Sequence, residues 1–393
     1  MPQSPFERIQ LPTPFQVGPV NAYLAGRTIV DPGPDSEAAR DALVDGLAAR
    51  GLDPTDVERV LVTHPHPDHF GQASRLAADG ATVCASPAAA PILRAFGERL
   101  EYEQTYFAAL FEAHGMDAET ARTVTQLPEA FLEYAPSTPV DHELADGDAV
   151  TVAGRTLTTR ELDGHAVGEL AWAFDADASG GADGDSTDAD AAHGDAAHPD
   201  ATSLRTALVG DHVLAETTPN PFLQPPEPGA GDGPADGDGD ATSDATTDAD
   251  DTARSDETAF SDADLKHDSP AALDDARPRV LPAYNDSLAT LRDVGYDRLL
   301  PGHGDPIEDP PARIDALLRA HEDRTAAVLE LVDGPTTATE VVRGLFPELP
   351  VIEYFSGMSE VLGHLDVLVR RGEVERRVLD ADAGELGFVR GSS

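Results

Sequence analysis

The chain has 393 residues, enough for a sizeable core in one large or two ordinary domains. Its 73 Asp and Glu residues against 27 Lys and Arg give a formal charge of -46 at pH 7, which argues against a basic surface for non-specific nucleic-acid binding. The single cysteine, Cys84, excludes an intrachain disulfide. The lack of a signal peptide and of an apolar run of about 18 residues predicts a cytoplasmic protein without a membrane span.

The acidic surplus also predicts a salt-rich cellular environment. Repulsion between so many like charges destabilises a compact chain, and salt relieves it because the Debye length falls to about 3 Å at 1 M. Low lysine, abundant Asp and Ala, and 5% aromatic residues are typical of an acidic, solvated surface. We therefore expect a halophilic protein.

The N-terminal part alternates between strand and helix patterns. Strands are expected at 15–17, 21–24, 28–30, 57–62 and 81–85, and helices at 36–49 and 71–77. Asp31 follows the third strand in an Asp-Pro-Gly turn, where its carboxylate either caps the bend or supports a metal-binding histidine from behind. Cys84 is expected to be a small buried hydrophobe. The alternation predicts an α/β layered domain.

The segment after the strand at 57–62 concentrates metal-ligand side chains. It reads Thr63-His64-Pro65-His66-Pro67-Asp68-His69, and three imidazoles and a carboxylate so close together are costly to bury without a partner. Such groups suit zinc, with iron or manganese as competitors. His64 and His66, two apart in an extended segment, can share one ion, while Asp68 and His69 can address a second. The two prolines suit a rigid loop better than a helix.

The stretch 88–135 is mostly helical and carries large side chains at helical spacing. Tyr102, Tyr106, Phe107 and Phe111 fit one buried helix face, so core packing is favoured over a role in lining a substrate site.

Three more ligand-type residues each follow a glycine after or between apolar strands. They are His165, Asp211 and His303. Glycine at such a position lets the backbone and a ligand approach closely. The predicted sets are His64, His66 and His165 for one ion and Asp68, His69 and His303 for the other, with Asp211 between them. His212 would point away from its neighbour Asp211 and is expected to be structural.

Two acidic tracts, at about 175–203 and 226–268, are rich in Asp, Ala and Gly and poor in apolar residues. They cannot bury enough surface to offset the entropy of ordering, so both are expected to be disordered insertions. The first separates apolar runs at 172–174 and 205–209, which could pair as a hairpin with a long tip. Beyond the second tract, a helix is expected at 281–294 and a strand at 298–300.

The C-terminal part has its own pattern. Helices are expected at 313–331, 337–346 and 359–369, and strands at 374–378 and 386–390. Three helices and a small β-ribbon are the pattern of a winged-helix module. The predicted domains are therefore residues 1–309, which hold the metal ligands, and residues 310–393.

The order HxHxDH, Gly-His, Gly-Asp, Gly-His resembles the metallo-β-lactamase superfamily, and Leu300-Pro301-Gly302-His303-Gly304 resembles its glyoxalase II and β-lactamase-like hydrolase branches. The likeness covers residues 15–305 apart from the insertions, and the C-terminal part is similar to the winged-helix tail of a branch that includes endoribonucleases. The resemblance implies a four-layer αββα sandwich with a dinuclear site at one edge of two sheets. The chain departs from many members at Asp163, where they have proline, and at Glu169, where they have histidine or serine.

The resemblance and the ligands together imply a hydrolase with two zinc ions. A water between two cations has its pKa lowered from roughly 16 to about 7, and Asp68 is expected to orient that hydroxide while it ligates. This chemistry serves thioesters, lactones, lactams and phosphodiesters alike. A small ester or thioester is the favoured substrate, with the C-terminal module walling the site or forming a homodimer.

Three alternatives stay open at this point. A nuclease would present five C-terminal arginines to a phosphate backbone, although ion pairs with Glu373 and Glu375 explain them more simply. These are Arg343, Arg370, Arg371, Arg376 and Arg377. An iron-dependent redox enzyme of the same fold is disfavoured because His66 stands where that type has a carboxylate. A metal-free binding protein is disfavoured by the intact ligand set.

Overall fold

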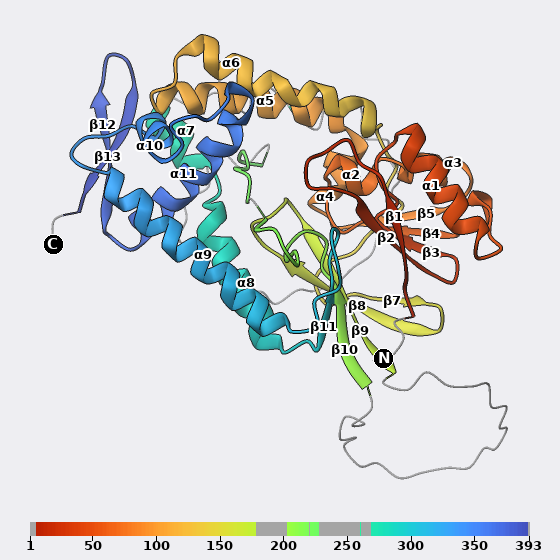
Figure 1. Ribbon diagram of the computed structural model, residues 1–393. Coiled ribbons are helices and arrows are strands. Elements are labelled where there is room, and N and C mark those ends of the chain that lie inside the picture. The colour runs from red at the N-terminus through yellow and green to blue at the C-terminus, as the bar shows by residue number, and fades with distance from the viewer. Residues whose placement is uncertain (1–4, 178–202, 220, 228–259, 261–268, 392–393) are drawn as a thin grey trace, which may run out of the picture.

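The computed structural model describes residues 5–177, 203–219, 221–227, 260 and 269–391 (Figure 1). Most of both predicted insertions, residues 178–202, 228–259 and 261–268, lies outside the described residues. The described strands extend into the margins of the first tract, as far as Asp177 and back to Ser203. Phe260 is also described and is buried at 8% exposure. No helix of the described part is both long and apolar enough to cross a membrane.

The first sheet has six strands in the order β1-β2-β3-β4-β5-β6. They are β1 Glu7–Leu11, β2 Val20–Ala25, β3 Thr28–Val30, β4 Arg59–Leu61, β5 Thr82–Ala85 and β6 His142–Glu143. The predicted strand at 15–17 is wrong, because that segment is a turn. The Thr13 hydroxyl donates to the Gly18 carbonyl at 2.8 Å, and Gly18 has a φ of 98°. The edge strand forms earlier, at Glu7–Leu11, where it pairs with β2.

The second sheet has five strands in the order β11-β10-β9-β8-β7. They are β7 Ala149–Val152, β8 Arg155–Leu162, β9 Glu169–Asp177, β10 Ser203–Leu208 and β11 Arg298–Leu300. The predicted hairpin across the first acidic tract is confirmed, because β9 and β10 are antiparallel neighbours with Trp172 opposite Leu208. β10 and β11 run parallel, so their carboxyl ends reach the same edge.

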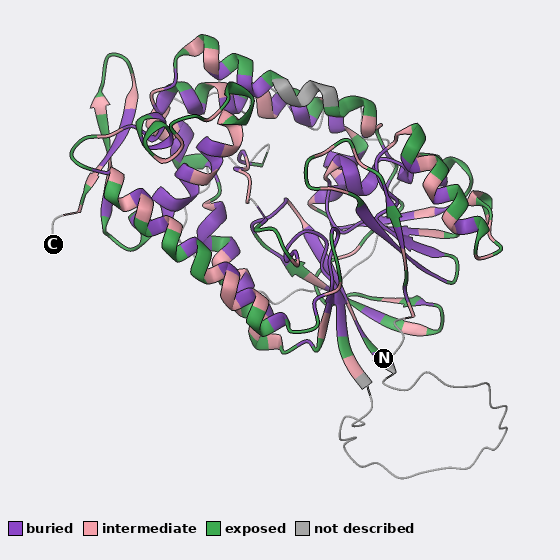
Figure 2. Ribbon diagram, viewed as in Figure 1, coloured by how far each residue is buried: buried purple, intermediate pink, exposed green. Residues whose placement is uncertain are grey.

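The two sheets and their covering helices form four layers. Apolar side chains of both sheets, among them Leu61, Cys84, Trp172 and Leu300, make the cluster between the sheets. Helices α1 Glu37–Ala48 and α3 Ala73–Ala78 cover the outer face of the first sheet. Helices α8 Val280–Val294 and α9 Pro310–Leu331 cover the second. Figure 2 shows the buried residues running along the strands and the inward faces of these helices. The αββα prediction is confirmed in this part of the chain.

Cys84 is a packing residue, as predicted. It is 2% exposed, and burial raises the pKa of its thiol to about 11.

A further group of elements packs around another core. It comprises α5 Phe96–Ala113, α6 Ala118–Gln126, α7 Pro270–Ala276, α10 Ala338–Leu345, α11 Tyr354–Arg370, β12 Val374–Asp380 and β13 Glu385–Arg390. Helix α4 Ala89–Arg94 packs instead in the cluster of the first sheet. Short 3-10 segments occur at Pro54–Asp56, Leu127–Tyr134 and Val351–Glu353. Tyr106, Phe107 and Phe111 of α5 lie in one cluster with residues of α10, α11 and β13, so the predicted core role of these aromatics is confirmed.

The C-terminal elements match the expected three helices and β-ribbon, but they do not have a core to themselves. Their cluster includes α5 and α6, and α9 places Ile314 against the second sheet and Val328 in the other core. Thr337 is the N-terminal cap of helix α10, and its side chain accepts from the Glu340 amide in a capping box. A separate winged-helix domain and the boundary at residues 309–310 stay predictions.

Candidate metal centre

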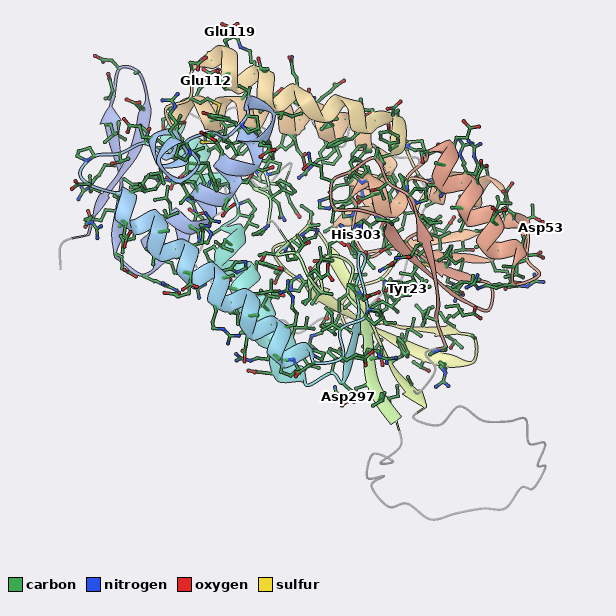
Figure 3. The ribbon with its side chains drawn as sticks, in the orientation of Figure 1. Tyr23, Asp53, Glu112, Glu119, Asp297 and His303 are labelled. Atoms are coloured by element: carbon green, nitrogen blue, oxygen red, sulfur yellow. The ribbon has the colours of Figure 1, made fainter. Side chains whose placement is uncertain are left out.

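The predicted ligands meet where strand ends of the two sheets come together. His64 follows β4, Asp211 follows β10, His303 follows β11, and His165 lies in the loop between β8 and β9. Two backbone hydrogen bonds join the sheets here, from Asn21 N to Gly302 O at 2.6 Å and from Leu170 N to Thr63 O at 2.8 Å. Figure 3 labels His303 at this junction.

All seven predicted ligand residues converge. Their ligand atoms form three groups in which every atom lies within 4.8 Å of the others. The groups are His64, His66 and His165; Asp68, His69 and His303; and His64, His69 and Asp211. The first two are the triads expected from the sequence, and the third places Asp211 between them. His66 is half-buried, and the other six are buried.

The expectation of a purely irregular ligand loop is wrong in one detail. His66 is the N-terminal cap of a short helix, α2 Pro67–Phe70, which carries Asp68 and His69. Pro67 occupies the first helical position, where its missing N–H leaves no bond unmade and its fixed φ suits the helix. The proline therefore starts the turn that sends Asp68 and His69 to the second group.

Asp31 orients two of the histidines. The Thr63 hydroxyl donates to Asp31 Oδ2 at 2.7 Å, so its oxygen is left to accept from His64 Nδ1 at 2.9 Å. His69 Nδ1 donates to the same carboxylate at 2.9 Å. Nε2 of both rings therefore faces the centre, where His64 Nε2 lies 3.0 Å from His66 Nδ1. These contacts show that Asp31 supports a ligand histidine, which is the second of its two predicted roles. Its hydrogen bond with the Thr63 hydroxyl was not predicted.

His303 is fixed in the same manner. Its Nδ1 donates to the Pro19 carbonyl at 2.9 Å, because a carbonyl only accepts, and this leaves Nε2 as the nitrogen that can bind a cation. That Nε2 lies 3.3 Å from Asp68 Oδ2 and 3.5 Å from Asp211 Oδ2. His69 Nε2 lies 3.5 Å from Asp211 Oδ1. Imidazole Nε2 atoms and carboxylate oxygens thus face a common space.

Unpaired buried atoms test whether this space suits a cation. His69 Nε2, His303 Nε2, Asp211 Oδ1 and both ring nitrogens of His165 are buried without a hydrogen-bond partner among the described residues. An unpaired buried polar atom costs about 1–3 kcal/mol, so several in one place need a common partner. Imidazole nitrogen and carboxylate oxygen are the ligand set of zinc. The centre fits a pair of divalent cations.

The ionisation of these groups fits the same interpretation. Burial lowers the pKa of His64 and of His165 well below the usual value, so both rings are neutral and can donate lone pairs. Burial opposes the charge of Asp211, but the positive charge of protonated His69 and His303 outweighs it and keeps its pKa below the ordinary range. The neighbouring carboxylates in turn raise the pKa of His69 and of His303 against the effect of burial, so a bound cation would take the place of protons on these two rings. The carboxylate stays ionised between the two triads.

Glu169 and His212 form a pair beside the centre. Burial, reinforced by the Asp211 charge, raises the pKa of Glu169 well above its usual value, and Glu169 Oε2 lies 2.9 Å from His212 Nδ1. Burial lowers the pKa of His212 to about 3, and its Nε2 meets the Ser287 hydroxyl at 3.1 Å. Both nitrogens are engaged away from the ligand groups, which confirms the predicted structural role of His212.

We expect Asp31→Asn to weaken zinc binding about 10- to 100-fold, because the carboxylate accepts from the Thr63 N–H on one oxygen and from the Thr63 hydroxyl and His69 on the other, and an amide has only one accepting oxygen. The backbone should tolerate the change, since Asp31 has a φ of 51° and asparagine adopts this conformation readily. Competition with a chromophoric chelator measures the affinity. The matched control is Asp35→Asn, which only weakens a pair with the half-exposed Arg75. Equal affinities in the two variants would contradict the supporting role of Asp31.

Known proteins resemble this chain over most of its length. The sequence profile described as Metallo-beta-lactamase superfamily matches residues 16–303. A curated relative from Bacillus subtilis (strain 168), named Probable metallo-hydrolase YqjP, is 26% identical over 365 residues, covering 92% of this chain and 91% of its own.

Solved structures share the fold over nearly the whole chain. The metallo-beta-lactamase family protein TTHA1429 from Thermus thermophilus is 25% identical, with a TM-score of 0.62 and 98% of each chain covered. A beta-lactamase domain protein from Burkholderia ambifaria, at 23% identity, has a TM-score of 0.65 and covers 99% of this chain and 93% of its own. The chain therefore belongs to the metallo-beta-lactamase superfamily, as an enzyme of that fold.

Proposed function

We propose that the chain is a dinuclear zinc-dependent hydrolase that cleaves an ester or thioester bond of a small substrate. The observation that carries the proposal is the pair of histidine-rich triads with Asp211 between them, all converging on one buried space. The name of the Bacillus relative, Probable metallo-hydrolase, supports the reaction class. Membership of the glyoxalase II branch and a winged-helix module are finer parts of the same proposal.

The protein groups in this mechanism position the ions, the water and the substrate. Two divalent cations, when bound, acidify water to near-neutral pKa and stabilise negative charge that develops on substrate oxygen. Asp68 Oδ2 faces His303, so we assign its other oxygen to orient the attacking water. His66 is half-buried and Asp68 is 8% exposed, which makes them the most accessible members of the centre. The substrate is expected to approach from their side.

Four of the five arginines of the nuclease alternative already have acidic partners, the exception among the described residues being the exposed Arg343. Arg370 contacts Asp286 at 2.7 Å, Arg371 contacts Glu322 at 2.6 Å, and Arg377 pairs with Glu375. Arg376 pairs with Asp274 and Asp275. Neutralised arginines offer little to a phosphate backbone, which supports a small acyl substrate over RNA.

We expect protein purified in high salt to contain close to two zinc ions per chain. We also expect Asp68→Ala to lower kcat/KM by about 10²- to 10⁴-fold with little loss of folding, because the substitution removes a positioned proton acceptor. Metal analysis gives the stoichiometry. A panel of an acyl thioester, a lactone, a lactam, a phosphodiester and RNA, assayed in high salt, gives the activity. The matched control is Asp41→Ala, on the exposed side of α1.

One iron per chain in place of zinc would contradict the dinuclear zinc assignment and favour the redox alternative. Cleavage of RNA with no turnover of the acyl substrates would contradict the proposed substrate class. Full activity of Asp68→Ala would refute the role of that residue.

A further inference from the structure

Helix α5 carries a buried arginine whose terminal nitrogens have no partner among the described residues. The Arg99 side chain is 4% exposed, and its Nε donates to Glu103 Oε1 at 2.6 Å. The guanidinium carbon lies 5.8 Å from the Tyr102 ring centre and 5.4 Å from that of Phe260. Within the part of the chain that the structure describes, Nε is the one guanidinium nitrogen that donates a hydrogen bond, and NH1 and NH2 are not among the fully buried unpaired atoms, so they remain accessible to a ligand.

A second buried arginine shows what a purely structural role requires. The Arg277 side chain is 1% exposed; its Nε bonds Asp274 at 2.8 Å, and NH1 and NH2 bond Asp366 at 2.6 and 2.8 Å. All three nitrogens of Arg277 are therefore satisfied by carboxylates. Arg99 is nearly as buried and has one of its three engaged, which leaves its forked end for a group that the described residues do not supply.

The position of Arg99 relates this fork to the metal centre. Phe96, at the start of α5, packs on Phe70 of α2 with ring centres 5.5 Å apart, and α2 carries Asp68 and His69. Arg99 and Glu103 follow Phe96 by three and seven residues, so they lie on the same side of the helix. Glu103 lies near enough to His66, the half-buried ligand residue, for the two side chains to interact electrostatically. The Arg99–Glu103 pair thus flanks the accessible side of the centre.

We propose that Arg99 is a substrate-binding residue that receives an anionic group, a carboxylate or a phosphate, on the substrate whose acyl bond is cleaved at the metal centre. The inference rests on the proposed hydrolase function and deepens it by naming the substrate class. A guanidinium fork binds two anionic oxygens in one plane, and the charge makes each hydrogen bond stronger than a neutral one. Glu103 and the two aromatic rings hold the side chain in place before the substrate arrives, so little entropy is lost on binding.

The kinetic test compares thioesters that differ only in one terminal group: carboxylate, phosphate or neutral carboxamide, placed on either side of the scissile bond. In the metal-loaded full chain, Arg99→Gln should raise KM for the preferred anionic substrate about 10- to 100-fold. The kcat/KM for the carboxamide should stay within about twofold. Arg99→Lys keeps the charge without the fork and should fall between, and it is the second variant if Arg99→Gln does not fold. The control is Arg122→Gln, on the exposed face of α6.

A binding test separates this inference from the hydrolase proposal. Titration calorimetry of the metal-loaded protein with glutarate and with inorganic phosphate should show binding that is about 10- to 100-fold weaker in Arg99→Gln and unchanged in Arg122→Gln. The tighter of the two probes identifies carboxylate or phosphate as the group. Equal binding by wild type and Arg99→Gln, or equal losses for anionic and neutral thioesters, would overturn the inference. Arg99-dependent binding without hydrolysis of any thioester would leave the inference standing and refute the proposed reaction.

Discussion

Replacing Gly302 by alanine is expected to empty part of the metal centre and to lower kcat/KM by at least about 100-fold. A Cβ at residue 302 would lie 2.6 Å from His69 Cε1 and closer still to Asp211 Oδ1. Both neighbours are buried metal-ligand residues, and neither is the free end of a flexible chain, so at least one must move. A displacement of about 1 Å at a reacting centre costs about 100-fold in rate. Metal content after gel filtration and steady-state kinetics measure the two effects.

The control for Gly302→Ala is Gly97→Ala in α5. A Cβ at residue 97 meets only Leu132 Cδ2, at an ordinary 3.8 Å, and alanine in a helix interior is favoured over glycine by about 0.5–1 kcal/mol. This variant should keep its metals and its activity. Two metal ions per chain and unchanged kcat/KM in Gly302→Ala would show that the centre accepts a methyl group, and the proposed placement of Asp211 and His69 as ligands would then be wrong.

Replacing Arg277 by methionine is expected to lower the free energy of unfolding by about 3–5 kcal/mol, the usual cost of leaving buried charges without their partner. Arg277 joins Asp274 of α7 to Asp366 of α11. Asp274 also accepts from His114 at 3.1 Å, so the network extends to the end of α5. Removing the guanidinium leaves Asp366 with Arg279 alone among its described ion-pair partners.

The decrease in the free energy of unfolding caused by Arg277→Met should depend on pH. Burial opposes the charge of Asp274, but His114 and the neighbouring guanidinium groups outweigh it and hold its pKa well below the ordinary range. A carboxyl group with a lowered folded-state pKa stabilises the fold above its unfolded pKa of about 3.9 and loses this contribution as pH falls. The deficit of Arg277→Met should therefore be full at pH 7 and shrink on acidification below about pH 4.

Urea unfolding at several pH values measures this deficit. The matched control is Arg370→Met, which removes an exposed pair with Asp286 and should change the free energy of unfolding by less than about 1 kcal/mol. Equal stabilities of the two variants at pH 7 would show that the buried network contributes no more than a surface ion pair.

The metal ligands could be predicted because their signals are local. His64, His66, Asp68 and His69 crowd one short segment, and His165, Asp211 and His303 each follow a glycine after or between apolar strands. Strand ends of the two sheets meet at one edge, so the pattern also predicted their convergence. The role of Asp31 stayed open because capping a turn and supporting His69 use the same carboxylate, and only the 2.9 Å contact in the folded chain distinguishes them.

Features that depend on distant contacts were missed. A short strand was predicted at 15–17, whereas the strand that pairs with β2 is Glu7–Leu11. Arg99 and Arg277 look like ordinary helix and loop arginines in the sequence, because the burial of a charged side chain is decided by what packs over it. The core that α5 and α6 share with the C-terminal elements joins segments more than 200 residues apart, which no local period reveals.

The pairing of Ser203 with Asp177 has a practical consequence. These two residues are directly opposed in an antiparallel pair of strands, so the end of β9 and the start of β10 are a short and fixed distance apart. Closing a connection between them costs only about 0.6 kcal/mol more for each doubling of its length. This tip is therefore a natural graft point, where a reporter or affinity domain with adjacent termini can be spliced into the chain while the strand ends that carry Asp211 and His303 keep their register.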